Sequence, residues 1–328
     1  GVLSAPKMLS RSPIAQVPPP KNMGISQYIK EIGRGPRGSK PLTREQAADL
    51  FGQLLDGNVT DLEIGAFCLA MRIKGETPEE MCGFLDAAHS RMALFPASDR
   101  PVIVLPSYNG ARKLPVLTPL LALLLAREGL PVLLHGMRTE ARRTLASDVL
   151  LALGVPALTA PEKIATGSVA HIETGYLHAA LARLLKVREV VGLRNAGHSI
   201  VKLMNPCAGP AVVVTSYTHP EYYDMLQATF GALHMTALLS RGLEGEVATD
   251  PRRTPRYEAF VAGVHQLLQE QQPGTAADVP GLPTEIDIDT TARYTKDVLD
   301  GRLPVPPALA QQVEHILHLA AQTPPHAP

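Results

Sequence analysis

From residue 101 onward, short aliphatic runs alternate with longer segments of helical character, and this alternation restricts the chain to few folds. Residues 102–105 and 132–134 have the β-branched and aliphatic composition of buried strands, and residues 118–127 between them have that of a helix. Parallel strands need a crossover connection, which is usually a helix, so this order predicts an α/β fold with a mostly parallel central sheet flanked by helices. The order continues with a helix, a strand, a helix, two strands and a closing helix, over residues 139–153, 211–215, 220–233, 236–240, 285–289 and 307–321.

The segment before this alternation, residues 42–92, predicts a small all-helical domain. Thr43 and Gln46 have the spacing of a capping box, and Thr77 precedes Pro78 at the first position of a further helix. A chain of 328 residues suits about two domains. We therefore expect an extended or disordered arm, a helical domain onto which helices from about 175–200 pack, and an α/β domain, over residues 1–23, 24–98 and 99–328.

Several classes of site are excluded by composition and spacing. The three cysteines lie far apart, so neither a disulfide framework nor a zinc ribbon is predicted, and a reducing cytosol is the simple inference. His315 and His318 are three apart but lack a third metal ligand. The longest apolar run, residues 116–126, contains Pro119 and is too short to cross a bilayer. We expect a cytoplasmic protein without membrane association, metal or cofactor.

The formal net charge is zero, but the charges are unevenly distributed. Residues 1–44 carry eight lysines or arginines and one acidic residue, Glu31. A basic arm on an acidic body is one signature of contact with polyanions, and a solvated flexible tail explains it equally well. Residues 33–40 match GxGxxG and nearly match a Walker A loop. Both motifs need a preceding strand and a helix that begins inside the motif, and neither is expected here because Pro41 follows.

Cations also gather where segments leave the predicted strands. The carboxyl ends of parallel strands meet at one crevice, so these side chains should converge there. Two of them, Arg138 and Arg142, are four apart and are expected on one face of the helix over 139–153. The candidates after the first two strands are Arg112, Lys113, Arg138, Arg142 and Arg143. Later segments add Arg194, His198, Lys202, Arg252 and Arg253.

Three motifs mark a family. They are KGET at 74–77, HGMR at 135–138 followed by ASDVLLALGV at 146–155, and VREVVGLRNAGHSIVKLMNP at 187–206. With them, roughly residues 24–325 resemble the anthranilate phosphoribosyltransferase (TrpD) family and its pyrimidine nucleoside phosphorylase relatives. The resemblance implies a helical domain followed by an α/β domain, and a homodimer formed through the helical domain.

The departures from this family pattern fall on its phosphate-binding parts. The family's glycine-rich GTGGDG turn, which holds phosphoribosyl pyrophosphate, falls on residues 107–113, where Gly110 is the one plausible survivor. The family's serine-rich turn falls on residues 141–145, and its acidic magnesium pair falls near Glu244-Gly245. Together these losses argue against phosphoribosyl transfer. The replacements resemble the YbiB-type subfamily, which the resemblance implies to be dimeric and to bind nucleic acids.

We therefore expect a protein without catalytic residues that binds DNA or RNA with little sequence preference. The candidate cations would contact backbone phosphates, and Tyr108 would stack on an unpaired base. One alternative is a phosphoribosyltransferase or nucleoside phosphorylase with an altered substrate, in whose favour residues 74–77, His135, Arg138 and Asn205 survive. A third interpretation is a scaffold whose cations meet an acidic protein.

Overall fold

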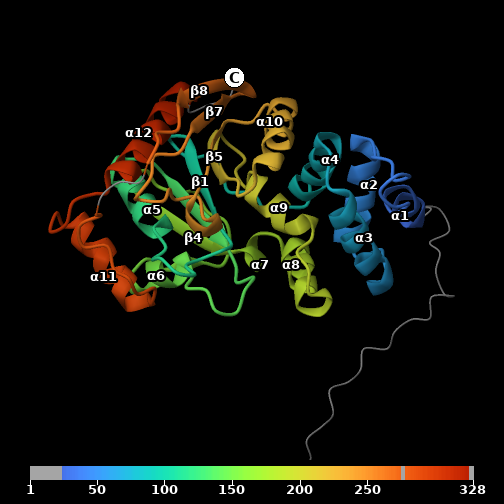
Figure 1. Cartoon of the computed structure of the whole chain (residues 1–328), viewed down its shortest axis with the longest axis horizontal. Helices are drawn as coiled ribbons and strands as arrows, with labels where there is room; N and C mark the ends of the chain where they lie inside the picture. The colour runs from blue at the N-terminus through green and yellow to red at the C-terminus, as the bar shows by residue number, and fades with distance from the viewer. Residues whose placement is uncertain (1–23, 275–277, 325–328) are drawn as a thin grey trace, which may run out of the picture.

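A computed structural model describes residues 24–274 and 278–324 and places a helical domain beside an α/β domain (Figure 1). The arm expected over residues 1–23 lies outside the described residues. The helical domain begins with α1 (Ser26–Ile32), α2 (Arg44–Leu55), α3 (Asp61–Lys74) and α4 (Pro78–His89). The expected capping box at Thr43 is confirmed, and Thr60 and Thr77 form the same motif at α3 and α4.

The KGET motif at residues 74–77 stabilises this domain from inside. Lys74 forms a buried ion pair with Glu80, whose carboxylate also accepts hydrogen bonds from the backbone amides of Leu42 and Thr77. Thr77 itself caps α4. A buried charge is tolerated when it is paired and fully hydrogen-bonded, as Glu80 is. Lys74 and Thr77 therefore have structural partners.

The part of the chain that the structure describes forms one eight-stranded sheet in the order β3-β4-β2-β1-β5-β6-β7-β8. β1 to β6 pair in parallel, whereas β7 and β8 add an antiparallel hairpin at one edge. This confirms the mostly parallel sheet. The strands are β1 (Val102–Ser107), β2 (Val132–Gly136), β3 (Ala157–Leu158), β4 (Val169–Glu173), β5 (Ala211–Ser216), β6 (Ala237–Ser240), β7 (Tyr257–Val261) and β8 (Val264–Gln269).

Helices cover both faces of the sheet, because successive side chains of its central strands point to opposite sides. Ile103 and Val212 pack into a core with α5 and α12, and Val104 and Val213 pack into another with α9 and the helical domain. The remaining helices are α5 (Thr118–Arg127), α6 (Ala146–Ala152), α7 (Thr174–Leu177), α8 (Ala179–Val191), α9 (Ala196–Leu203), α10 (Tyr223–Ala232), α11 (Ile288–Leu299) and α12 (Pro307–Gln322). No helix in the described ranges is long and apolar enough to cross a membrane.

Two predicted elements are wrong. Residues 285–289 are predicted as a half-exposed strand, but Asp287 caps α11 by accepting a hydrogen bond from the amide of Thr290. The helix predicted over 139–153 begins only at Ala146. Residues 137–145 form a loop instead, because the guanidinium of Arg138 binds three of the loop's own carbonyl groups. Arg138 and Arg142 therefore share no helix face.

Candidate functional site

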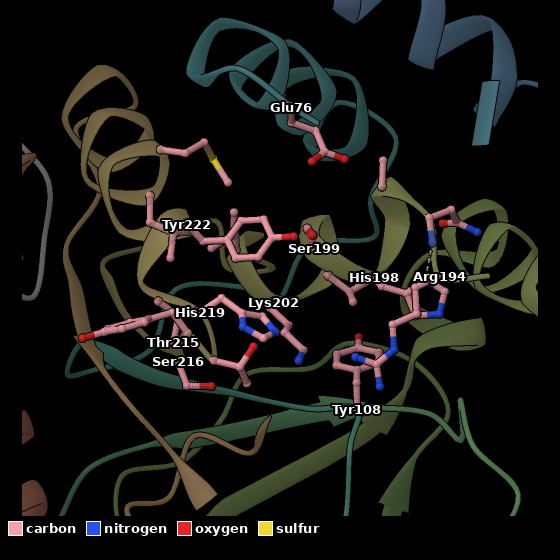
Figure 2. Close-up of a pocket in the computed structure, with 18 of the residues that line it drawn as sticks. Glu76, Tyr108, Arg194, His198, Ser199, Lys202, Thr215, Ser216, His219 and Tyr222 are labelled. Atoms are coloured by element: carbon pink, nitrogen blue, oxygen red, sulfur yellow. Dashed lines mark hydrogen bonds between the residues drawn. The ribbon is translucent and has the colours of Figure 1, made fainter. Parts of the chain in front are cut away.

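A cavity of about 310 Å³ opens where the helical domain meets the carboxyl ends of β1 and β5. The chain leaves β1 toward β2 on one side of the sheet and later returns to β5 on the other. Such a reversal of strand order is where open α/β sheets bind ligands. Figure 2 shows Glu76 on one side of the cavity and Lys202 with Arg194 on the opposite side. Burial lowers the pKa of Lys202 to about 8, so its amine is still mostly protonated at pH 7.

The turn after β1 is filled by the carboxylate of Glu246. One of its oxygens accepts hydrogen bonds from the Ser107 hydroxyl at 2.6 Å and the Thr118 hydroxyl at 2.8 Å. The other accepts from the backbone amides of Asn109 and Gly110, both at 3.0 Å. Glu246 is 3% exposed. The amides that would be needed to hold a phosphate at the start of this turn are thus already used.

Glu244 occupies the second half of the same turn. Its carboxylate accepts hydrogen bonds from the amides of Lys113 and Leu114, each at 2.9 Å, and from that of Arg112 at 3.4 Å. Gly245 separates the two glutamates, and a Cβ there would lie 2.5 Å from the Asn109 side-chain nitrogen. Only glycine allows the two segments to approach so closely.

The loop over residues 137–145 lies against this turn. Ala111 and Thr144 form an isolated antiparallel bridge, and the Thr139 hydroxyl donates to the carbonyl of Tyr108. Arg112 and Lys113 are exposed on the turn, as Arg142 is on the loop. The structure gives these three side chains no ion pair or hydrogen bond within the described residues. The convergence of the first two cationic segments is therefore seen in the fold.

Glu140 ties this loop to α8 and to the start of α9 through three arginines. It accepts from Arg143 at 2.6 Å, from Arg194 at 2.8 Å and from Arg188 at 3.1 Å. Desolvation alone would raise the pKa of Glu140, but the hydrogen bonds from these arginines outweigh it and lower the pKa to about 2. The cluster keeps an excess of positive charge close to Lys202.

We expect Glu140→Gln to destabilise the protein by about 1–3 kcal/mol at pH 7, the usual loss for hydrogen bonds to a charged group. The folded-state pKa of Glu140 lies below its unfolded value of about 4.3. Its contribution is therefore complete above the unfolded pKa and is lost as the pH falls toward 2. Urea unfolding of both proteins between pH 7 and pH 2.5 measures this. A difference between them that stays constant over this range contradicts the assigned charge state.

Four of the expected contact residues have other structural tasks, which corrects their assignment. Arg143 and Arg194 are bound to Glu140 and are not free cations. His198 caps α9, since its Nδ1 accepts from the amide of Asn195, and burial together with the nearby arginines lowers its pKa to about 4. It is therefore neutral at pH 7. Tyr108 is 4% exposed, so its ring offers no free face for stacking.

The Tyr108 hydroxyl lies 2.7 Å from His135 Nδ1 and 2.9 Å from the Thr174 hydroxyl, which fixes the ring between β1 and β2. Two further candidates, Arg252 and Arg253, are exposed, but both lie close to Asp250. Arg138 also stays exposed, 3.9 Å from Asp148. The sequence interpretation missed Glu140 and Glu246. The one signal for the latter is the Glu-Gly-Glu spacing at 244–246, which resembles a damaged magnesium pair.

Comparison with known proteins agrees with this architecture. Residues 26–92 match the helical bundle domain of the glycosyl transferase family. Anthranilate phosphoribosyltransferase from Methylorubrum extorquens (strain PA1) is 31% identical over 219 residues, which span 64% of this chain and 65% of that protein. The crystal structure of anthranilate phosphoribosyltransferase (TrpD) from Thermus thermophilus superimposes with a TM-score of 0.68 and 22% identity, over 90% of this chain and 87% of that one.

The fold and the helical domain therefore define a TrpD-like protein with a phosphoribosyltransferase-type fold. Within this class, the Escherichia coli (strain K12) protein YbiB is 37% identical over 298 residues, which cover 89% of this chain and 92% of YbiB. The chain belongs to the YbiB family.

Proposed function

We propose that this protein binds DNA or RNA with little sequence preference through the cations that surround the turn after β1. One observation supports this most. The turn's amides are taken up by Glu244 and Glu246, whereas the side chains of Arg112 and Lys113 on the same turn are exposed and unpaired within the described residues. Long exposed cations reach phosphates that are spaced along a polymer, and such contacts carry no base information.

The Glu140 cluster supports the same proposal. Three arginines share one carboxylate, so the surface between the loop 137–145 and α9 keeps excess positive charge. Arg142 on that loop and Lys202 on α9 add to it. A positive surface on a protein without net charge attracts polyanions locally.

Salt dependence tests the proposal directly. We expect the logarithm of the affinity for an oligonucleotide to fall linearly with the logarithm of salt concentration, because bound cations on the nucleic acid are released. The slope should be about −0.9 per neutralised phosphate on duplex DNA and about −0.7 on single strands. Fluorescence anisotropy with labelled oligonucleotides of unrelated sequence measures it. An affinity that is flat across salt concentrations, or that depends strongly on sequence, contradicts phosphate contacts of this kind.

A second candidate function is suggested by the cavity at β1 and β5. It has the size of a small-molecule site and contains Lys202 and Glu76, so an altered transferase or phosphorylase activity has a place to act. Against it, the turn that would hold a phosphate is blocked by carboxylates. Turnover of anthranilate with phosphoribosyl pyrophosphate and magnesium would favour this second candidate over the first.

We further propose that the protein is a homodimer through its helical domain. Leu62, Leu69 and Ile73 are exposed along one face of α3, and Val190 is 89% exposed near the end of α8. The guanidinium of Arg72 binds the carbonyl of Arg194, which brings the end of α3 to the segment after α8. An exposed apolar patch of this kind commonly marks an interface. A dimer would join two cationic surfaces and raise the affinity for a polymer.

We expect Ile73→Asp combined with Leu69→Asp to give a monomer that remains folded, because both side chains are exposed in the single chain. Analytical ultracentrifugation measures the mass, and circular dichroism reports folding. The matched control is Val264→Asp with Leu267→Asp on β8, which are exposed apolar residues in the other domain. A wild-type protein that is monomeric at micromolar concentration, or a dimer that survives the α3 changes, contradicts the assignment.

A further inference from the structure

The two glutamates that fill the turn after β1 are held very differently. Glu246 is deeply buried and is bound by two hydroxyl groups as well as two amides, so it belongs to the interior of the domain. Glu244 lies at the outer half of the turn, is only partly buried, and is bound by backbone amides alone. Removing the Glu244 carboxylate should therefore expose its site without opening the core.

The site that Glu244 occupies is a set of consecutive backbone donors. The amides of Arg112, Lys113 and Leu114 all point at one carboxylate. Successive backbone N–H groups that converge on one point form an anion-binding concavity, and phosphate is its usual occupant in proteins. The exposed side chains of Arg112 and Lys113 supply positive charge beside it.

The backbone of Glu244 adopts a conformation that few residues other than glycine accept. Its φ is +54° and its ψ is 32°, in the left-handed region. Non-glycine residues are disfavoured there, so the surrounding contacts must offset the cost. The following residue, Gly245, also has a positive φ and packs against Asn109. This double left-handed turn carries the carboxylate to the amides.

We propose that Glu244 is a specificity-determining residue that fills this anion site and thereby excludes small phosphate anions. A small phosphate would have to displace a carboxylate that is tethered beside the amides and repels it. A nucleic acid does not need the amides, because the side chains of Arg112 and Lys113 reach its phosphates from the surface. The polymer half of this inference rests on the proposed function, whereas the exclusion of small phosphates stands on the turn itself.

Inorganic pyrophosphate is the probe that tests the exclusion. For the wild-type protein we expect no binding at millimolar pyrophosphate by isothermal titration calorimetry and no rise in melting temperature. For Glu244→Ala we expect affinity to increase by roughly 10- to 100-fold, the range that hydrogen bonds to a charged group supply. The melting temperature of this variant should rise with ligand concentration, because the ligand binds only the folded state. Glu270→Ala removes an exposed carboxylate at the end of β8 and should behave like wild type.

Glu244→Gln provides a second variant in case the alanine change prevents folding. It removes the charge but keeps a carbonyl that can accept from the same amides, so its gain in pyrophosphate affinity should be smaller than that of alanine. The inference is overturned if wild type binds pyrophosphate as tightly as the folded variants, or if neither folded variant gains affinity. An oligonucleotide titration of wild type separates the two proposals. If wild type ignores oligonucleotides while Glu244→Ala gains pyrophosphate binding, the exclusion holds and the proposed function fails.

Discussion

Glu246→Ala is expected to destabilise the protein by about 3–5 kcal/mol, the range for removing one partner of a buried charged network. The change leaves the amides of Asn109 and Gly110 and the hydroxyls of Ser107 and Thr118 without their acceptor inside the domain. Each buried donor without a partner costs about 1–3 kcal/mol, although the hydroxyls can rotate toward other acceptors. Urea unfolding followed by circular dichroism gives the free energy of unfolding.

Glu244→Ala is the matched control for this change, because it removes the neighbouring carboxylate from the same turn. Water can replace that carboxylate at the outer half of the turn, and the strained left-handed position is relieved of none of its backbone cost. We therefore expect a loss of about 1 kcal/mol or less. Equal losses for the two variants would mean that Glu246 does not hold the turn to the core as described.

Combined replacement of Arg112, Lys113 and Arg142 by alanine should lower the affinity for any oligonucleotide by roughly 100-fold at low salt. The salt slope should also become shallower by about one for each phosphate that the variant no longer neutralises. Stability should barely change, because exposed cations without partners contribute little to it. Fluorescence anisotropy across a salt series, with melting temperatures recorded beside it, gives both quantities.

Two controls make this result specific. Arg293, Lys296 and Arg302 are exposed cations on and after α11, and their combined change to alanine should leave the affinity near that of wild type. Arg143→Ala should lower stability, since Arg143 is held by Glu140, whereas Arg142→Ala should not. If the triple variant binds like wild type, the contact lies elsewhere, and the exposed cations between Lys30 and Arg44 are the next region to test.

The elements that could be predicted from the sequence are those whose signal is local. The capping boxes at Thr43 and Thr77, the buried strands β1 and β2, and the full extent of α5 follow from capping residues and apolar runs. The loop over 137–145 could not be predicted, because its shape depends on Glu140 reaching arginines about fifty residues later in the chain. Propensity alone favours a helix there, and tertiary hydrogen bonds override it.

The candidate site was predicted in its position and only partly in its chemistry. Cations on the segments after β1 and β2 were expected to converge, and the contact between Ala111 and Thr144 joins these segments. Which cations are free could not be inferred, since Arg142 and Arg143 are adjacent in sequence but only Arg143 meets a carboxylate. Likewise, an aromatic residue on a turn is expected at the surface, whereas Tyr108 is enclosed between His135 and Thr174.

The Glu-Gly-Glu segment at 244–246 also limits how this protein could be converted into an enzyme. Restoring a glycine-rich turn over residues 107–113 would not by itself recreate a phosphate cradle, because the donors would still face two carboxylates from a segment about 135 residues further along the chain. Changing that segment first would leave the donors of the turn unsatisfied and the domain weakened. Neither order of single changes passes through a stable, phosphate-binding intermediate, except one that begins at Glu244. A protein engineer would therefore have to redesign both segments together.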